Sequence, residues 1–294
     1  MTPEDDAGFV ARCVALCPGF VADPQRLRAR KSALLCGRVD GLPVVAKAVA
    51  HPKGTGSPGS SLARPNAVWS WYLAREIAIY RAFAAAPPPF RVPRLVAASA
   101  ELLVIERLPG APLASRRRPA AALDEPTLRA FVALRAQLAA WRAPATPAPT
   151  PAVRAQLRER LLEDPTDPAW IPDGLARAGR RGLIAPERAA QLVTTLDPTL
   201  ATCHGDLLLR NVLADGGGLA LVDWECAGPY LRDWDLALLW TQLAPPARAQ
   251  LAALVDAGPA FFALCAFALV RELRFEAAYG RTSDTLRAEL AELA

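Results

Sequence analysis

The stretch of sequence that decides the fold runs from residue 202 to residue 225 and reads TCHGDLLLRNVLADGGGLALVDWE. Its apolar runs, residues 211–214 and 219–222, flank an aspartate and three glycines, which is typical of a β-hairpin. Paired strands lie about 4.8 Å apart, so the end of the second strand returns to the start of the first. The pattern therefore predicts that Asn211 and Asp223 are neighbours. Asp206, on the loop that enters the hairpin, is expected within reach of the same point.

The three side chains that this hairpin is expected to gather all carry oxygen donors. Carboxylate and carboxamide oxygens are the ligands that Mg²⁺ prefers, and Mg²⁺ usually completes its shell with water and phosphate oxygens. Asn211 and Asp223 would therefore suffice as protein ligands, which leaves Asp206 to accept a proton from an attacking hydroxyl. Aspartate and asparagine at the ends of a hairpin can also be plain turn residues. The order and spacing of all three favour a catalytic site.

The same spacing occurs in protein kinases, where a catalytic Asp is followed by four residues and an Asn, and then by a metal-binding Asp after a short hairpin. Here the loop reads His-Gly-Asp in place of His-Arg-Asp. The segment from residue 202 to residue 237 resembles the aminoglycoside phosphotransferase family and its choline kinase and fructosamine kinase relatives. The resemblance implies that Asp206 is the catalytic base, that Asn211 and Asp223 bind Mg²⁺, and that Asp235 braces the catalytic loop.

The rest of the chain has a β-rich beginning and a helical remainder, which predicts an α+β, protein kinase-like fold of two lobes. Residues 1–107 are expected to form a small nucleotide-binding lobe, and residues 108–294 a larger, mostly helical catalytic and substrate lobe. Strands are predicted at residues 32–36, 42–50, 94–98 and 102–106, and helices at 68–83, 127–141, 153–163, 186–196, 247–255 and 261–279. The hairpin at 211–222 is the single strand pair expected among the later helices. Residues 143–151 alternate Ala, Thr and Pro and are interpreted as a polyproline-like spacer.

A charged pair is predicted inside the small lobe. Lys47 shares a strand face with Val45 and Val49, and an inward-facing lysine is costly unless it is paired. Glu76 lies on an apolar helix face with Tyr72, and it also needs a partner. Pairing the two resolves both difficulties and reproduces the lysine and glutamate that hold ATP phosphates in kinases. The alternative is that Lys47 snorkels at a sheet edge while Glu76 pairs with a nearby arginine.

The segment 103–110 resembles the connector between the two lobes of the family. The resemblance implies that its backbone meets the adenine of ATP, with the Glu106 carbonyl and the Leu108 N–H as candidates. Residues 36–41 lack the glycine pattern of protein kinases. The chain also lacks a Walker A motif, which excludes the P-loop kinases.

Bulk properties exclude several other classes of function. The net charge of +5 comes from 34 Lys+Arg and 29 Asp+Glu, and because the arginines are scattered, no nucleic-acid partner is expected. The densest run, residues 116–118, is interpreted as an exposed loop. Residues 260–270 form the longest apolar run, which is too short for the ~20 residues of a bilayer span, so no membrane partner is expected. The N-terminus is acidic, unlike the basic start of a signal peptide. The six cysteines lack CxxC pairing and are interpreted as buried free thiols, which suit a cytoplasmic location.

The function predicted from these observations is transfer of the γ-phosphoryl group of ATP to a hydroxyl of a small molecule such as an aminoglycoside, an amino alcohol or a sugar. A nucleotide-binding pseudokinase or scaffold is the alternative, and the missing Ala-Pro-Glu of an activation segment argues against a protein kinase. The acceptor and the oligomeric state stay open. A polycation would need an acidic pocket, for which the candidates are Glu159, Glu163, Asp164 and Asp167. Because arginines are interleaved with these residues, the run is interpreted instead as a solvated helix face. A quaternary ammonium would need an aromatic cage drawn from Trp170, Trp224, Tyr230, Trp234 and Trp240.

Overall fold

The computed structural model describes residues 3–28, 32–49, 67–160, 162–278, 280 and 282–293, and the chain forms two compact units. The first unit comprises Met1–Gly110, Pro144–Arg154 and Ala220–Glu225. The second comprises Ala111–Ala143, Ala155–Leu219 and Cys226–Ala294. The backbone thus passes between units near the predicted boundary of residues 107 and 108, and two later segments belong to the first unit.

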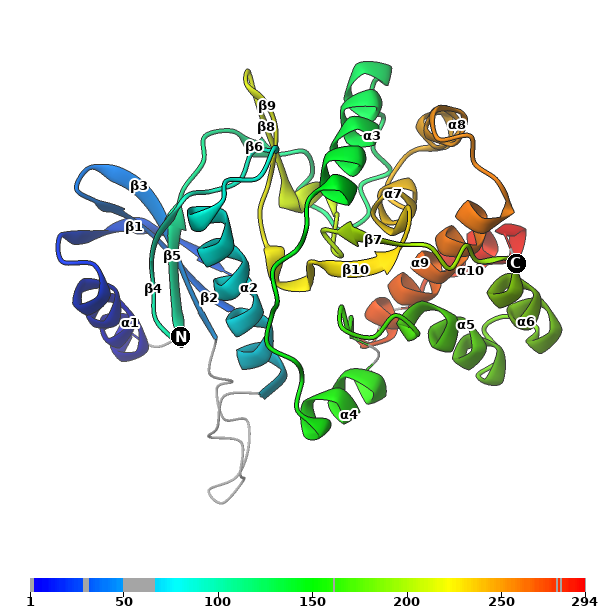
Figure 1. Ribbon diagram of the computed structural model, residues 1–294, viewed down its shortest axis with the longest axis horizontal. Helices are drawn as coiled ribbons and strands as arrows, with labels where there is room; N and C mark the ends of the chain where they lie inside the picture. The colour runs from blue at the N-terminus through cyan, green and yellow to red at the C-terminus, as the bar shows by residue number, and fades with distance from the viewer. Residues whose placement is uncertain are drawn as a thin grey trace. The chain divides into compact units, whose positions relative to one another are not determined.

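The first unit is built on a five-stranded antiparallel sheet with strand order β1-β2-β3-β5-β4 (Figure 1). The strands are β1 (Phe20–Arg28), β2 (Ser32–Val39), β3 (Leu42–Val49), β4 (Leu95–Ala98) and β5 (Leu102–Glu106). The four predicted strands are confirmed, and β1 is an addition. In the register, Lys47 of β3 lies between Leu34 of β2 and Leu103 of β5, at the centre of the sheet. The edge-strand alternative for Lys47 is therefore wrong.

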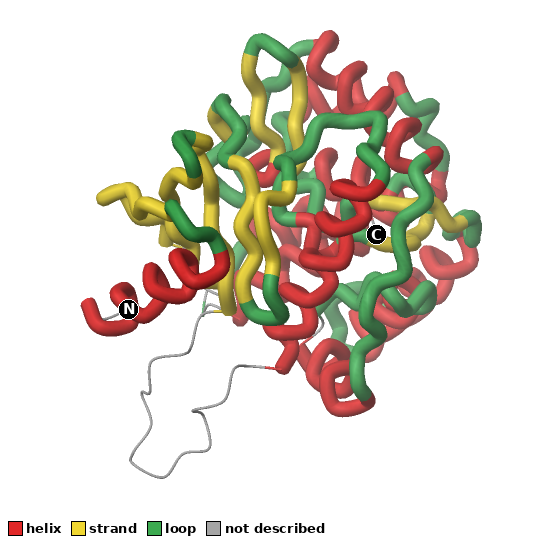
Figure 2. The backbone as a smooth tube through the Cα atoms, turned by 60° about the vertical axis from the view of Figure 1, so that its left-hand side comes forward, coloured by secondary structure: helices red, strands yellow, loops and turns green. Residues whose placement is uncertain are grey.

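Two helices use the two faces of this sheet (Figures 1 and 2). Helix α1 (Pro3–Leu16) buries Phe9 and Cys13 in one core with Val44 and Ala46 of β3. Because strand residues alternate between faces, Lys47 points to the other side. Helix α2 (Ala67–Ala85) supplies that side, and its buried residues include Glu76. The sequence predicted α2 but not α1.

The Pro-rich segment packs against α2 within the first unit. The indole Nε1 of Trp71 donates a hydrogen bond of 2.9 Å to the Pro147 carbonyl, and Arg75 Nη1 donates one of 2.5 Å to Thr146 Oγ1. The segment has no helix or strand from residue 142 to residue 150, as the sequence predicted. These hydrogen bonds fix the segment to the helix, a role that its interpretation as a polyproline-like spacer did not include.

The second unit is mainly helical. Helix α9 (Pro259–Ala278) packs against α5 (Trp170–Arg180), α6 (Pro186–Thr195), α7 (Trp234–Trp240) and α10 (Asp284–Leu293). Helices α3 (Glu125–Ala140) and α8 (Pro245–Leu254) also pack together, and α4 (Pro151–Arg160) begins in the first unit and ends in the second. Most of the predicted helices are confirmed within a few residues, whereas α5, α7 and α10 were not predicted.

The expectation of a single strand pair among these helices is wrong. The predicted hairpin is present as β8 (Val212–Asp215) and β9 (Gly218–Leu221), with the short strand β6 (Ala111–Pro112) beside β8. A further antiparallel pair joins β7 (Leu200–Cys203) to β10 (Gly228–Leu231). The register places Cys203 opposite Gly228. Because β7 ends at Cys203, the His-Gly-Asp loop begins at the next residue.

Two further predictions concern side-chain environments. The six cysteines are free and buried, as predicted. The exposed-loop interpretation of residues 116–118 is wrong for two of its arginines: Arg117 pairs with Glu272 at 2.6 Å and Arg118 with Glu289 at 2.7 Å. Among the described residues, every helix is too short or too polar to cross a bilayer.

Candidate active site

A glycine gives the predicted catalytic loop its shape. Gly205 has φ +82°, a left-handed conformation that L side chains rarely adopt. A Cβ at this position would lie 2.2 Å from the carbonyl oxygen of Cys226, so no larger residue fits without moving the backbone. This close approach is the physical reason that the motif reads His-Gly-Asp here. The turn delivers the next residue, Asp206, into a buried position.

The buried carboxylate of Asp235 holds the same loop by its backbone N–H groups. Asp235 Oδ2 accepts a hydrogen bond of 2.6 Å from the His204 N–H, and its Oδ1 accepts one of 2.9 Å from the Gly205 N–H. Burial raises the pKa of Asp235, although these backbone hydrogen bonds oppose the rise. Trp234 Nε1 also donates to the Gly205 carbonyl at 3.1 Å. The bracing geometry that the resemblance implied for Asp235 is present, and buried His204 takes part through its backbone.

Asp206 and Asn211 lie together in the second unit. Asn211 ends a 3₁₀ turn, and its Nδ2 donates to the Asp206 carbonyl at 2.9 Å and to Asp206 Oδ2 at 3.1 Å. Asp206 is only 4% exposed. Its other oxygen, Oδ1, lies 2.5 Å from Nη2 of Arg271, a residue of α9 that the sequence did not single out.

In the first unit, one ammonium group lies among three carboxylates. Lys47 Nζ lies 2.5 Å from Asp223 Oδ1, 2.6 Å from Glu76 Oε2 and 3.1 Å from Glu225 Oε2. The predicted pairing of Lys47 with Glu76 is confirmed. Burial alone would lower the pKa of Lys47, but the charges of Asp223, Glu225 and Glu76 outweigh burial and raise it well above its ordinary value. Glu225 was quoted in the motif but not predicted as a site residue; its signal is the Asp-x-Glu spacing after the hairpin.

Two carboxylates of this cluster, Asp223 and Glu225, flank Trp224, whose packing fixes the segment. Asp223 has φ +67°, and Trp224 is fully buried between Phe83, at a ring distance of 5.0 Å, and Phe90, at 5.3 Å. Glu76 Oε1 accepts a hydrogen bond of 3.2 Å from the Trp224 N–H. Burial raises the pKa of Glu76 to about 7, despite the ammonium beside it. These anchors direct the neighbours of Trp224 toward Lys47.

The donor chemistry of the same cluster suits a divalent cation. Oxygen atoms of Glu76, Asp223 and Glu225 lie within 4.8 Å of one another, and Mg²⁺ prefers carboxylate ligands. The Asp223 side chain is 22% exposed, so it can meet a ligand, whereas Glu76 is fully buried. Asp223 thus fits the metal-binding role that the sequence predicts. Its predicted meeting with Asn211 would join the two units and stays a prediction.

The connector residues lie at and just beyond the end of β5, in the five-stranded sheet of the first unit. Glu106 is the last residue of β5; its N–H donates to the Arg94 carbonyl at 2.8 Å, and its side chain accepts from the Arg94 N–H at 3.3 Å. The Arg107 N–H donates to the Pro43 carbonyl at 2.8 Å, and Leu108 follows, half-buried. The roles of the Glu106 carbonyl and the Leu108 N–H toward adenine stay predictions.

The sequence also matches a known family. Residues 61–268, well over half of the chain, match the family described as the phosphotransferase enzyme family. This chain belongs to that family. One curated relative, an uncharacterized protein of Deinococcus radiodurans, is 42% identical over 59 residues. This match spans 19% of this phosphotransferase and 17% of that protein.

Solved structures share the fold of this phosphotransferase. The macrolide 2'-phosphotransferase MphH of Brachybacterium faecium is 17% identical, with 99% of this chain and 98% of that chain covered and a TM-score of 0.61. A choline/ethanolamine kinase family protein of Mesorhizobium loti is 20% identical, with coverages of 99% and 92% and a TM-score of 0.56. The predicted protein kinase-like fold and the resemblance to this family are confirmed.

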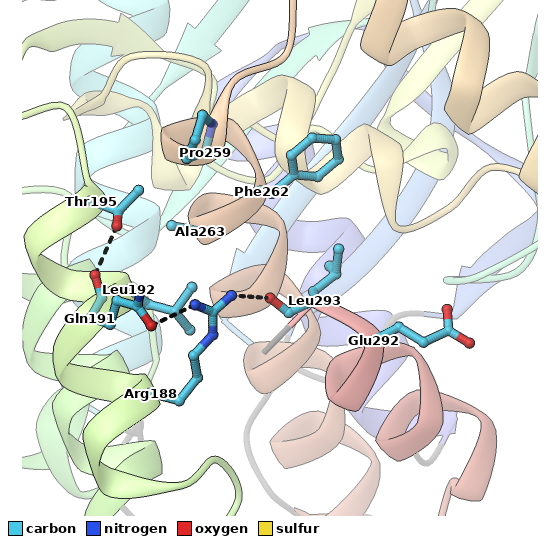
Figure 3. Close-up of a pocket in the computed structure, with 9 residues that line it drawn as sticks. All are labelled: Arg188, Gln191, Leu192, Thr195, Pro259, Phe262, Ala263, Glu292 and Leu293. Atoms are coloured by element: carbon cyan, nitrogen blue, oxygen red, sulfur yellow. Dashed lines mark hydrogen bonds between the residues drawn. The ribbon is translucent and has the colours of Figure 1, made fainter.

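The second unit of the phosphotransferase also contains a cavity that is separate from the predicted site residues. It measures about 390 Å³ and is lined by residues of α6, α9 and the C-terminal helix α10 (Figure 3). Arg188 crosses it, donating to Gln191 Oε1 at 2.7 Å and to the Leu293 carbonyl at 3.2 Å. None of its lining residues is one of the predicted site residues.

The acidic run considered for a cationic acceptor is already engaged. Glu163 pairs with Arg271, Asp167 pairs with Arg158 at 3.4 Å, and Asp164 accepts hydrogen bonds from the backbone and side chain of Thr166. These carboxylates therefore do not form the open acidic pocket that a polycation requires. The interpretation as a solvated helix face is also wrong for Glu163 and Asp164, which are buried.

Three of the aromatic residues considered for a cage, Trp170, Tyr230 and Trp234, pack on one another. Trp170 lies edge-on to Trp234 at 5.5 Å and to Phe267 at 4.9 Å, and Tyr230 stacks on Trp234 at 6.3 Å. The Tyr230 hydroxyl donates to the Cys226 carbonyl at 2.9 Å. This cluster is part of the core of the second unit, in which Tyr230 and Trp234 are buried.

Proposed function

We propose that this phosphotransferase transfers the γ-phosphoryl group of ATP to a hydroxyl of a small molecule. The observation that carries the proposal is the Asp206–Asn211 arrangement, a buried carboxylate held by the amide five residues later on a loop that a second carboxylate braces. Kinases use this pattern to orient an attacking hydroxyl and to hold a metal ion. The Lys47–Glu76 pair, which the kinase template requires separately, is a further support.

Each proposed role follows from the chemistry of the residue. Asp206 accepts the proton of the attacking hydroxyl and fixes its orientation, which is the main demand of a loose transition state. Lys47 binds the ATP phosphates, and Glu76 keeps its ammonium in place. The Glu106 carbonyl and the Leu108 N–H bind the adenine. Asn211 and Asp223 are the proposed ligands of Mg²⁺, which would supply positive charge to the phosphate oxygens.

Contacts in the second unit favour an uncharged hydroxyl compound over a cation as the acceptor. The acidic run is engaged with arginine and with backbone N–H groups, and Trp170, Tyr230 and Trp234 pack together in a core. A sugar-like acceptor needs neither an acidic pocket nor an aromatic cage. A cytoplasmic location belongs to the same proposal, because a reducing compartment suits six free, buried cysteines.

The test is a screen for ATP consumption over sugars, nucleosides, amino alcohols and aminoglycosides, with Mg²⁺ present. We expect turnover with an uncharged member of the panel and less or none with the aminoglycosides. Turnover with aminoglycosides alone would contradict the acceptor assignment. A thermal shift with Mg·ATP and no consumption across the panel would contradict the proposed transfer and support a pseudokinase.

A further inference from the structure

Asp206 is held at both carboxylate oxygens, by Asn211 five residues later and by Arg271 on a distant helix. Oδ2 accepts the amide hydrogen bond of Asn211 at 3.1 Å, and Oδ1 receives the guanidinium of Arg271 at 2.5 Å. Arg271 comes from α9, 65 residues later. With one partner at each oxygen, the plane of the carboxylate cannot rotate without losing a charge-assisted or amide hydrogen bond.

The arginine that reaches Asp206 is itself fixed. Arg271 is 7% exposed and also pairs with Glu163 through the same edge of its guanidinium, while its Nη1 donates to Glu272 Oε1 at 2.9 Å. Glu272 in turn accepts two hydrogen bonds from Arg117, of 2.6 Å and 2.8 Å. A planar guanidinium with partners on several edges is held in one orientation. Arg271 of α9 therefore holds the Asp206 carboxylate in a defined position.

This network suits the demands of phosphoryl transfer. The transition state is loose, so the base contributes more by orienting the hydroxyl than by its proton affinity. A carboxylate offers about four lone-pair sites, so Asp206 keeps acceptor capacity for a hydroxyl beside the hydrogen bonds from Asn211 and Arg271. A guanidinium lowers the proton affinity of the carboxylate with which it pairs, which matters little in this mechanism. The same pairing fixes the direction in which the remaining lone pairs of Asp206 point.

We propose that Arg271 is a positioning residue that sets the orientation of Asp206 for attack by the acceptor hydroxyl. This inference rests on the proposed function, since it assigns Arg271 a part in that same reaction. A purely structural arginine would stabilise the second unit without acting through Asp206. The two roles differ in what they predict for kcat when Asp206 is absent.

The chain offers a matched control for this test. Arg117 belongs to the same network and binds the same Glu272, but its contacts with that network run through Glu272 and not through Asp206. Arg271→Met and Arg117→Met each remove one guanidinium from the cluster. Arg271→Lys keeps the charge but loses the planar fork, and serves as the milder variant if Arg271→Met does not fold.

The experiment measures kcat and the KM for ATP with the acceptor found in the panel or, if none is found, with water, through release of inorganic phosphate. We expect Arg271→Met to lower kcat about 100-fold, the scale for misplacing a reacting group. We expect Arg271→Lys to recover part of that loss and the KM for ATP to stay within about twofold. Arg117→Met should keep kcat within about threefold while lowering Tm.

A double variant separates positioning from stability. In the Asp206→Asn background, Arg271→Met should lower kcat no further, because it acts through the missing carboxylate. Equal kcat losses from Arg271→Met and Arg117→Met, or the same fold loss with and without Asp206, would overturn the inference while leaving the proposed function intact. If the wild-type protein transfers phosphate neither to an acceptor nor to water, the proposed function fails and this inference fails with it.

Discussion

The two buried ionic clusters of this protein differ in their charge balance. The Lys47 cluster of the first unit sets one ammonium against the carboxylates of Glu76, Asp223 and Glu225, a formal charge of −2. The Arg271 cluster of the second unit sets two guanidinium groups against three carboxylates, and Arg210 lies 3.7 Å from one of these, Asp206. Counted over these groups alone, with every carboxylate ionised, the first cluster is the more negative of the two, which suits the binding of a cation. The second is close to neutral, which suits holding a side chain in place.

The largest expected effect comes from emptying the first cluster of its cation. Lys47→Met leaves the buried carboxylates of Glu76 and Glu225 and the half-buried one of Asp223 without their counter-charge, and breaking a buried pair costs about 3–5 kcal/mol of unfolding free energy. Urea unfolding at neutral pH measures the loss. Because oxygen ligands of Mg²⁺ are then released, we expect MgCl₂ to raise the Tm of the variant more than that of the wild type. Equal stabilities, or equal Mg²⁺ responses, would contradict the charge surplus assigned to this cluster.

A smaller effect is expected from Glu272→Gln in the second cluster, about 2 kcal/mol at neutral pH, because glutamine keeps an acceptor for the arginines. Burial alone would raise the pKa of Glu272, but Arg117 and Arg271 outweigh burial and lower it from its ordinary 4.5. A carboxylate with a lowered pKa stabilises the folded state above its unfolded value and loses this contribution as the pH falls through the folded value.

The stability gap between wild type and Glu272→Gln should therefore be full at pH 7 and shrink as the pH falls below about 4.5. Urea unfolding across that range measures the gap. A gap that is independent of pH would show that Glu272 contributes through packing instead of charge.

The smallest effect sharpens the comparison at the surface. Arg129 and Glu125 lie 2.6 Å apart, the same separation as Lys47–Glu76 and Arg117–Glu272, but their side chains are 63% and 53% exposed. Water screens such a pair, so Arg129→Gln should change the unfolding free energy by less than about 0.5 kcal/mol. A loss as large as that of the buried variants would mean that distance, and not burial, sets these energies.

The sequence predicted those parts of the fold and the site in which local pattern and long-range packing agree. Lys47 and Glu76 each sit on an otherwise apolar face, so the cost of burying either charge alone identified the pair. The Gly-rich turn at residues 215–218 predicted the hairpin for the same reason, since its conformational needs are local.

The parts that were missed depend on long-range contacts. Helix α5 contains Pro172, Gly174 and Gly179, which disfavour a helix, and Gly174 is needed because a Cβ there would lie 2.2 Å from the Phe267 ring. Arg271 follows a long apolar run of α9, which indicates burial but not a partner. Its contacts come from residues 65 and 108 positions earlier, a pairing that no local pattern specifies.

The central claim is that Asp206 carries phosphoryl transfer from ATP to a small-molecule hydroxyl. The direct test incubates the wild type and Asp206→Asn with Mg²⁺ and γ-labelled ATP over the acceptor panel, and follows label into products and nucleotide binding by titration. We predict label in a small-molecule product for the wild type, a loss of roughly a thousandfold in kcat for the variant, and ATP affinity within about twofold. Label transfer by Asp206→Asn at the wild-type rate would contradict the account.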